Sequence, residues 1–260
     1  MPVFPFVHFM KSIMSFLLAM VALVTGIKAQ QKDTLLIIPG SPNLQTDRLA
    51  NYSRTYDFFS VKDGIETKVG GLHDTFTINK NDKHVQGLRV CQISFGTNQI
   101  LDSGLCQLNG LKPIYHRSIQ TKKVMNLVFT KGAVQGSVSK NDQPNAEMIN
   151  YAVEVPLFDS YYEDIIAKSI NIKNGLVFKF PEYIYERGGT VWSLGQITGN
   201  EKLKDQSGNS ITVRTVKFYE LDNEKKIVRT TIYKIGERDR DILSREYVTG
   251  TGRIVMRKKV

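Results

Sequence analysis

Residues 156–183 read PLFDSYYEDIIAKSINIKNGLVFKFPEY and decide the predicted fold, because they interrupt a long series of short strands once. Ser160 and Glu163 have capping-box spacing, in which a hydroxyl and a carboxylate satisfy the first free amides of a helix. Four apolar side chains recur at helical period. They are Tyr162, Ile165, Ile166 and Ile170. With Gly175 as its end, the stretch predicts one helix near residues 159–170 that packs against a sheet through its isoleucines.

Strand-like runs lie on both sides of this helix, at intervals of about 8–12 residues. They cover residues 52–61, 75–79, 87–95, 100–108, 112–118, 123–130, 133–139 and 151–155, then 176–180, 190–198, 211–219, 227–235, 242–248 and 253–257. Asp63-Gly64 and Asn109-Gly110 supply turn residues between runs. Some runs, such as LVFKF at 176–180, are apolar on both faces. The pattern predicts a mainly β fold with a curved antiparallel sheet, packed on both faces or folded around a cavity.

The first 29 residues have the order of a secretory signal peptide. They contain no acidic residue, and Lys11 precedes the apolar run IMSFLLAMVALV at residues 13–24. This run is shorter than the roughly 20 residues that a membrane-spanning helix needs. Ala29 is a small residue of the kind found at cleavage sites. We expect cleavage after Ala29 and a mature chain that begins at Gln30, with an uncleaved membrane anchor as the alternative.

The chain is basic with or without this leader. It has 35 Lys and Arg residues against 25 Asp and Glu residues, and loss of Lys11 and Lys28 lowers its formal net charge from +10 to +8. Because an exported chain rarely meets nucleic acid, nucleic acid is excluded as a partner, and the basic excess is expected to face solvent or an anionic envelope surface. Residues 30–50 read as an extended lead-in and residues 51–260 as one antiparallel β domain.

Two cysteines, Cys91 and Cys106, form an even pair in a chain bound for an oxidising compartment. Their midpoint lies in a polar gap, between Asn98 and Gln99. If this gap is a symmetric hairpin loop, the two residues lie opposite each other, close enough for a disulfide. Two buried free thiols are the alternative, and both remain open.

Three passages resemble an exported bacterial envelope family of unassigned function. They are ILDSGLCQLNGLKPIYHRS at residues 100–118, VFTKGAVQGSVS at 128–139, and the helical stretch with the strands that come after it. That family is similar in architecture to the periplasmic lipoprotein-sorting carriers. The resemblance covers residues 70–260 and rests on turns and apolar positions, so it implies a fold and no reaction.

The resemblance implies an incomplete β-barrel, closed on one side by the central helix, with an apolar interior able to shelter lipid or lipoprotein acyl chains. Candidate cavity residues are Ile165, Ile166, Phe178, Phe180, Tyr183, Trp192 and Phe218. The alternative is that these side chains fill the core, as is usual in barrels and sandwiches of this size. The chain departs from many envelope lipoproteins because no cysteine for acylation follows its leader.

No catalytic constellation emerges from the sequence. The histidines after the leader are His73, His84 and His116, which lie far apart and form no metal-ligand pair. Ser137 and Lys140 have the spacing of an acyl-enzyme pair but are expected at a β turn. Helix capping accounts for the carboxylates of Asp159, Glu163 and Asp164. We therefore predict no enzyme activity, no catalytic or metal-binding residue and no cofactor.

Three functions are ranked on these observations. The first is a non-enzymatic exported protein, periplasmic, associated with the outer membrane of a Gram-negative bacterium or secreted, that binds or places an apolar or lipidic component. The second is a structural or interaction domain with a filled interior, whose partner is another envelope protein. The third is an envelope hydrolase, ranked last because it lacks a catalytic group.

Overall fold

The computed structural model describes residues 34–80, 84–204, 210–222 and 224–259. The predicted signal peptide and its cleavage site lie outside these ranges. Residues Leu36–Val260 group into one compact unit; of the other unit, Met1–Leu35, only Thr34 and Leu35 are described. In the described ranges, no helix is both long enough and apolar enough to cross a membrane.

Strands make up most of the described chain. The strands before the helical stretch are β1 (Leu35–Leu36), β2 (Tyr52–Lys62), β3 (Ile65–Lys80), β4 (Val85–Phe95), β5 (Asn98–Gln107), β6 (Lys112–Gln120), β7 (Lys123–Phe129), β8 (Ala133–Lys140) and β9 (Glu147–Ala152). The remaining strands are β10 (Phe158–Asp159), β11 (Val177–Ile184), β12 (Gly189–Lys204), β13 (Ser210–Leu221), β14 (Ile227–Gly236), β15 (Ile242–Thr249) and β16 (Gly252–Lys258). The helices are η2 (Thr46–Arg48), η3 (Ser160–Tyr162), α2 (Glu163–Ser169) and η4 (Tyr185–Arg187).

The described strands form one 16-stranded sheet, in which long antiparallel pairs join sequence neighbours. The order β11-β12-β13-β14-β15-β16-β2-β3-β4-β5-β6-β7-β8-β9 contains one return, where β16 pairs with β2. The sheet is open, because β9 and β11 stand near opposite ends of this order. The predicted fold class, a curved antiparallel sheet or incomplete barrel with one central helix, is confirmed.

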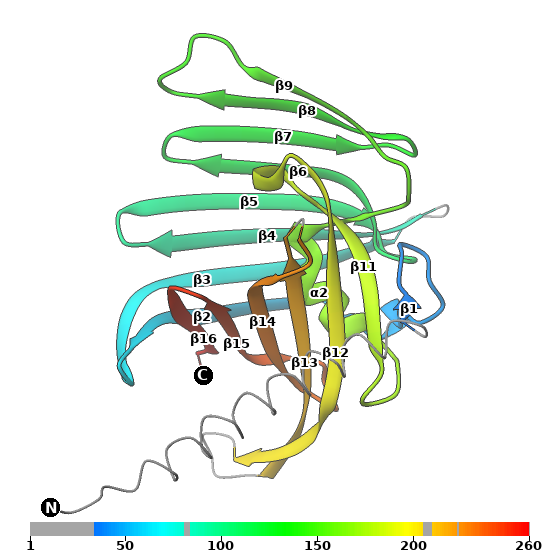
Figure 1. The fold of residues 1–260 in the computed structure, drawn as a ribbon, viewed down its shortest axis with the longest axis vertical. Helices are drawn as coiled ribbons and strands as arrows, with labels where there is room; N and C mark the ends of the chain where they lie inside the picture. The colour runs from blue at the N-terminus through cyan, green and yellow to red at the C-terminus, as the bar shows by residue number, and fades with distance from the viewer. Residues whose placement is uncertain (1–33, 81–83, 205–209, 223, 260) are drawn as a thin grey trace, which may run out of the picture. The chain divides into compact units, whose positions relative to one another are not determined.

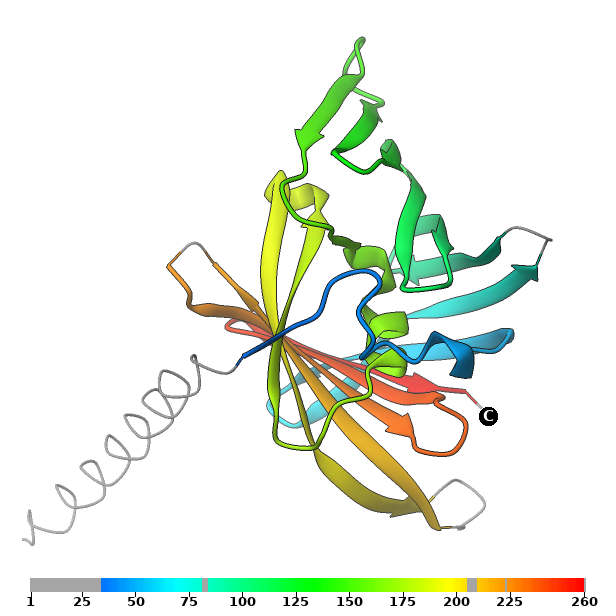
Figure 2. The ribbon, with the colours of Figure 1, turned by 90° about the vertical axis from the view of Figure 1, so that its right-hand side faces the viewer.

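The sheet curves strongly, so that its two arms lie on either side of α2. One arm consists of β3 to β9 and the other of β11 to β16. In Figure 1 the strands β3 to β9 lie in one stack, and β11 to β14 cross their direction steeply. Figure 2 shows α2 on the concave side, between these two sets of strands. Side chains on the concave face therefore meet the helical stretch, where residues from both arms come together.

Glycines sit where the sheet bends. The register of β2 with β3 shifts between Phe58 and Phe59, beside Gly70. A Cβ on Gly70 would lie 2.0 Å from the backbone oxygen of Ser94, so the neighbouring strand could not approach a larger residue. A second shift, in β12, falls at Gly199, whose φ of 134° is open only to glycine. These bulges explain why long strands curve instead of forming a flat sheet.

The central helix lies where the sequence predicts it, but its start differs. The side chain of Asp159 accepts a hydrogen bond from the Tyr161 amide, so Asp159 caps η3 in place of Ser160. The predicted capping box is therefore wrong, and the Glu163 carboxylate pairs with Arg229 instead. All seven residues of α2 are buried, charged ones included, which is why the helix shows no solvent-facing side.

The apolar interior is filled by aromatic side chains. Phe180 lies 4.8 Å from Phe218 and 5.9 Å from Phe178, measured between ring centroids. Gly195 makes room for Phe178, since a Cβ there would lie 2.1 Å from that ring. Of the predicted cavity residues, those buried are Ile165, Ile166, Phe178, Phe180, Tyr183 and Phe218. Trp192 is 39% exposed, so its prediction as an interior residue is wrong; it faces outward beneath Lys179.

The two cysteines do not lie opposite each other. The turn between β4 and β5 falls at Gly96 and Thr97, so Cys91 pairs with Asp102 and Cys106 with Gly87. At about 3.3 Å per residue, this register places the cysteines roughly 13 Å apart along the hairpin. Both are buried free thiols, so the predicted opposition across the hairpin is wrong.

Native protein is expected to protect both thiols from alkylation. Burial raises the pKa of Cys91 and of Cys106 to about 12, which leaves little thiolate at pH 8. Labelling with iodoacetamide should be on the order of a thousandfold slower in native than in unfolded protein. An intact mass about 2 Da below that of the reduced chain would instead reveal a disulfide.

Candidate functional site

A polar row crosses four neighbouring strands on the concave face. Cross-strand pairing joins Asp74 to Cys91, Cys91 to Asp102, and Asp102 to Ser118. Side chains directly opposite each other in a sheet share a face. Residues distant in sequence therefore form one surface toward η3 and α2.

Gly104 lets the helical stretch approach this surface. A Cβ at this position would lie 2.8 Å from both the Tyr161 ring and the Tyr162 hydroxyl. With glycine there, Tyr161 reaches across and donates from its hydroxyl to the Asp102 carbonyl at 3.1 Å. The glycine in the DSGLC passage thus fixes the distance between sheet and helix.

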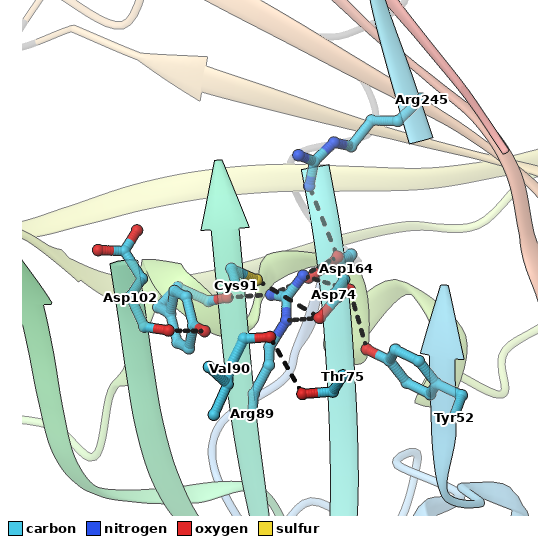
Figure 3. A network of polar contacts seen from close by, with 10 residues as sticks. Tyr52, Asp74, Thr75, Arg89, Val90, Cys91, Asp102, Asp164 and Arg245 are labelled. Carbon is cyan, nitrogen blue, oxygen red and sulfur yellow. Dashed lines mark hydrogen bonds and ion pairs between the residues drawn. The ribbon is translucent and has the colours of Figure 1, made fainter. Parts of the chain in front are cut away.

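Arg89 joins the sheet to α2 through two buried carboxylates (Figure 3). Its Nε and Nη2 donate to Asp74 at 3.0 and 2.9 Å, while Nη1 and Nη2 donate to Asp164. The side chains of all three are only 3% exposed. Nη1 also donates to the Tyr161 carbonyl, and the Tyr52 hydroxyl donates to Asp74. Burial disfavours the charged guanidinium, but Asp164 and Asp74 outweigh it and raise the pKa of Arg89.

Two further arginines approach α2 from the opposite arm. Arg229 pairs with Glu163 at 3.3 Å and with Glu220 at 3.1 Å. Arg245 lies 3.6 Å from Asp164 and stacks over the Tyr247 ring at 4.6 Å. Figure 3 shows Arg245 reaching toward Asp164 from the side opposite Arg89. The charges on α2 are thus neutralised from both arms of the sheet.

Two adjoining cavities lie beside this network. The ionic cavity, of about 220 Å³, is lined by Arg89, Arg229, Arg245, Asp164 and neighbouring residues. The histidine cavity, of about 210 Å³, is lined by Asp102, His116, Ser118, Gln120, Met125, Leu127, Asp159 and several tyrosines. They share Asp102, Ser160, Tyr161 and Glu186, so together they form one polar cleft. Among the predicted cavity residues, only Tyr183 lines it.

An imidazole stands at the back of the histidine cavity. His116 Nδ1 lies 3.2 Å from Asp159 Oδ2, and its ring stacks on Tyr161 at 4.6 Å. Burial acts to lower the pKa of His116, but the Asp159 carboxylate outweighs it and the pKa is raised. In Asp102, burial raises the pKa of the carboxyl group although Ser118 and His116 act against it. His116 and Asp102 thus offer hydrogen-bonding groups to the cavity, although burial disfavours the charged form of each side chain.

The side chains that line this cleft are able to form hydrogen bonds with a polar ligand. In the described ranges, no three His, Cys, Asp or Glu side chains converge as metal ligands. Both thiols carry raised pKa values and are poor nucleophiles. Carboxyl, imidazole, hydroxyl and amide groups line the walls instead, and all of them exchange hydrogen bonds with a polar ligand.

Sequence reasoning missed most of this cleft. As a metal ligand, His116 has no partner at ligand spacing in the sequence. Arg89 carries no local signal, because its partners lie on other elements. One signal was present: Asp159 and Asp164 flank Tyr161 and Tyr162 in the helical stretch, where four polar or aromatic residues must find buried partners.

A buried carboxyl group behind the cleft makes stability depend on pH. Burial, followed by the charge of Glu163, raises the pKa of Glu182 to about 8, against a usual 4.5, while the Ser193 hydroxyl donates to it at 2.6 Å. The folded state thus keeps a proton that the unfolded state releases. Stability must therefore fall as pH rises from about 4.5 to 8.

Glu182→Gln is expected to remove this fall. Relative to wild type, the free energy of unfolding of the variant should increase by roughly 2–4 kcal/mol between pH 5 and pH 9. Urea unfolding at a series of pH values measures it, with the exposed Glu154→Gln as control. Parallel curves for wild type and Glu182→Gln would contradict the assignment.

Comparisons with known proteins place the fold. A crystal structure described as a beta-barrel-like protein of domain of unknown function DUF1849 from Brucella abortus matches with a TM-score of 0.55 and 10% identity, covering 82% of this chain and 97% of that chain. At this identity the likeness concerns the fold alone. No curated protein matches the chain. The model of a family described as a protein of unknown function (DUF3108) matches residues 51–256.

Proposed function

This chain belongs to the DUF3108 family of proteins of unknown function, and we propose that it is an exported, non-enzymatic protein that binds an amphipathic component of the cell envelope by that component's polar part. The observation that carries this proposal is the polar cleft on the concave face. Its two cavities share four residues, so one ligand of ordinary small-molecule size spans both.

The filled interior determines which part of the ligand enters. Phe178, Phe180 and Phe218 occupy the space that an acyl chain would need. The cleft, in contrast, is walled by charged and hydroxylated side chains. A binding mode through the polar part fits both observations better than a carrier that encloses whole acyl chains.

The leader pattern supports export. Residues 1–29 combine a basic start, an apolar run and a small residue, an order that supports export to the periplasm, to the outer membrane or out of the cell. A function without covalent chemistry is supported by the cleft itself, since burial raises the pKa of the Cys91 thiol on its wall to about 12.

A second candidate function is a protein-interaction domain. The filled interior fits it equally, and large apolar side chains are exposed on several strands of one arm. Among them are Leu101 on β5, Val128 on β7 and Met148 on β9. The two candidates differ in whether the cleft holds a small molecule.

Native mass spectrometry of protein purified from its own host tests the proposal. Wild type is expected to carry a small-molecule adduct. Ser160→Trp, which fills the cleft at a residue shared by both cavities, should lose it. Ser139→Trp on the exposed side of β8 is the matched control and should keep it. Ligand-free wild type, or an adduct that survives in Ser160→Trp, would overturn the proposal.

A further inference from the structure

Among the described residues, three side-chain atoms of the histidine cavity are buried without a hydrogen bond: Asp102 Oδ1, His116 Nε2 and Asp159 Oδ2. Asp159 Oδ2 faces the imidazole at 3.2 Å, whereas Asp102 Oδ1 and His116 Nε2 have no such neighbour on the described residues. A buried polar atom without a partner costs free energy. Both residues line the same cavity, so one ligand can satisfy both atoms.

The cavity has room for a six-membered ring. A cavity of roughly 150 Å³ is enough to bind benzene. The histidine cavity measures about 210 Å³, which leaves space for substituents around such a ring. Met125 and Leu127 line it with buried apolar side chains, while Ser118, Ser160 and Gln120 line it with polar ones. An occupant therefore needs an apolar face and polar edges.

Charge selects against ionic occupants. An anion would lie among the carboxyl groups of Asp102, Asp159 and Glu186. An ammonium group would lie against His116, whose contact with Asp159 favours the positive imidazole. Hydroxyl groups each donate and accept, so they match the carboxyl oxygen and the ring nitrogen at once.

We infer that the histidine cavity binds a saccharide unit, seated with the C–H face of its ring on Met125 and Leu127 and its hydroxyls on Asp102 and His116. This inference rests on the proposed function and names the polar part of its ligand. The saccharide is thus the polar part of a glycolipid, which is the amphipathic component of the proposed function.

Isothermal titration and saturation-transfer NMR with methyl glucoside and N-acetylglucosamine test this inference on the wild-type chain. Inorganic phosphate and ethanolamine serve as the anionic and cationic probes. At least one saccharide is expected to bind and both ionic probes to fail. Binding of an ionic probe alone would overturn the inference.

Asp102→Asn identifies the site. The amide keeps the shape of the carboxyl group and removes a buried charge, so folding is retained, while the affinity for saccharide should fall roughly 10-fold or more. Ser118→Ala gives a second, smaller loss, and Asp142→Asn in the exposed turn after β8 should change nothing. Unchanged affinity in Asp102→Asn and Ser118→Ala would place the saccharide elsewhere and overturn the inference.

Mass spectrometry of the native ligand distinguishes a failure of the saccharide inference from a failure of the proposed function. An adduct whose fragments include a sugar supports both. An adduct without sugar, lost in Ser160→Trp, leaves the proposed function standing and overturns the saccharide. No adduct and no saccharide binding would sink both.

Discussion

Replacement of Arg89 by alanine is expected to lower the free energy of unfolding by roughly 3–5 kcal/mol. The guanidinium is the shared partner of Asp74 and Asp164, and all three side chains are only 3% exposed. Its removal leaves two buried carboxylates facing each other without a positive charge between them. Urea denaturation followed by circular dichroism measures the change.

A matched arginine on the surface provides the control. Arg257 also donates two hydrogen bonds to one carboxylate, that of Glu66. The side chains of Arg257 and Glu66 are 50% and 36% exposed. Arg257→Ala should cost at most about 1 kcal/mol, because solvent screens an exposed pair. Equal losses in Arg89→Ala and Arg257→Ala would show that the Arg89 network does not join sheet and helix.

Phe180→Ala is expected to lower the free energy of unfolding by a similar amount, roughly 3–5 kcal/mol. Phe180 has no exposed surface and contacts Phe158, Phe178 and Phe218. Truncation leaves a void that rigid neighbouring rings cannot close. The cost is large because the ring fills the core and does not line an open cavity.

Trp192→Ala is the control, because Trp192 is an aromatic residue that does not fill the core. The sequence predicts both Trp192 and Phe180 inside the barrel, yet Trp192 faces outward, with the Lys179 ammonium over its ring. Trp192→Ala should lower the free energy of unfolding by less than about 1.5 kcal/mol, mainly through loss of the cation–π contact. A mild effect in Phe180→Ala, similar to that in Trp192→Ala, would mean that the interior is open after all.

Sequence patterns predicted the elements of this fold well. Alternation and turn residues are local signals, so the strands from 52–61 to 253–257 were found to within a few residues in most cases. The Asp63-Gly64 turn forms as predicted, with positive φ at both residues. The first half of β3, residues 65–71, was missed because its solvent-facing residues show no alternation.

Local sequence patterns did not predict the pairing register of neighbouring strands. The cysteine pair predicts a hairpin centre between Asn98 and Gln99, two residues beyond the observed turn at Gly96 and Thr97. Each residue of shift moves the two strands by two positions relative to each other, so a plausible bridge became a separation of four residues. Turn position depends on backbone geometry that Gly96, with φ of 59°, decides.

The cleft was missed for the same reason. Asp74, Arg89, Asp102 and His116 each look like ordinary polar residues in alternating strands. Which of them faces α2 depends on curvature and on pairing across four strands. The aromatic core was foreseen as a set of residues, with a cavity lining and a filled core as the two alternatives, because packing density cannot be read from residue types alone.

A crystal structure of the protein purified from its native host, with its ligand retained, distinguishes binding by a polar part from enclosure of an acyl chain. We expect density for a ligand in the cleft beside Asp102, Ser160 and Tyr161, with Phe178, Phe180 and Phe218 packed together as they are here. An apolar chain lying between displaced phenylalanine rings, with the cleft empty, would contradict it.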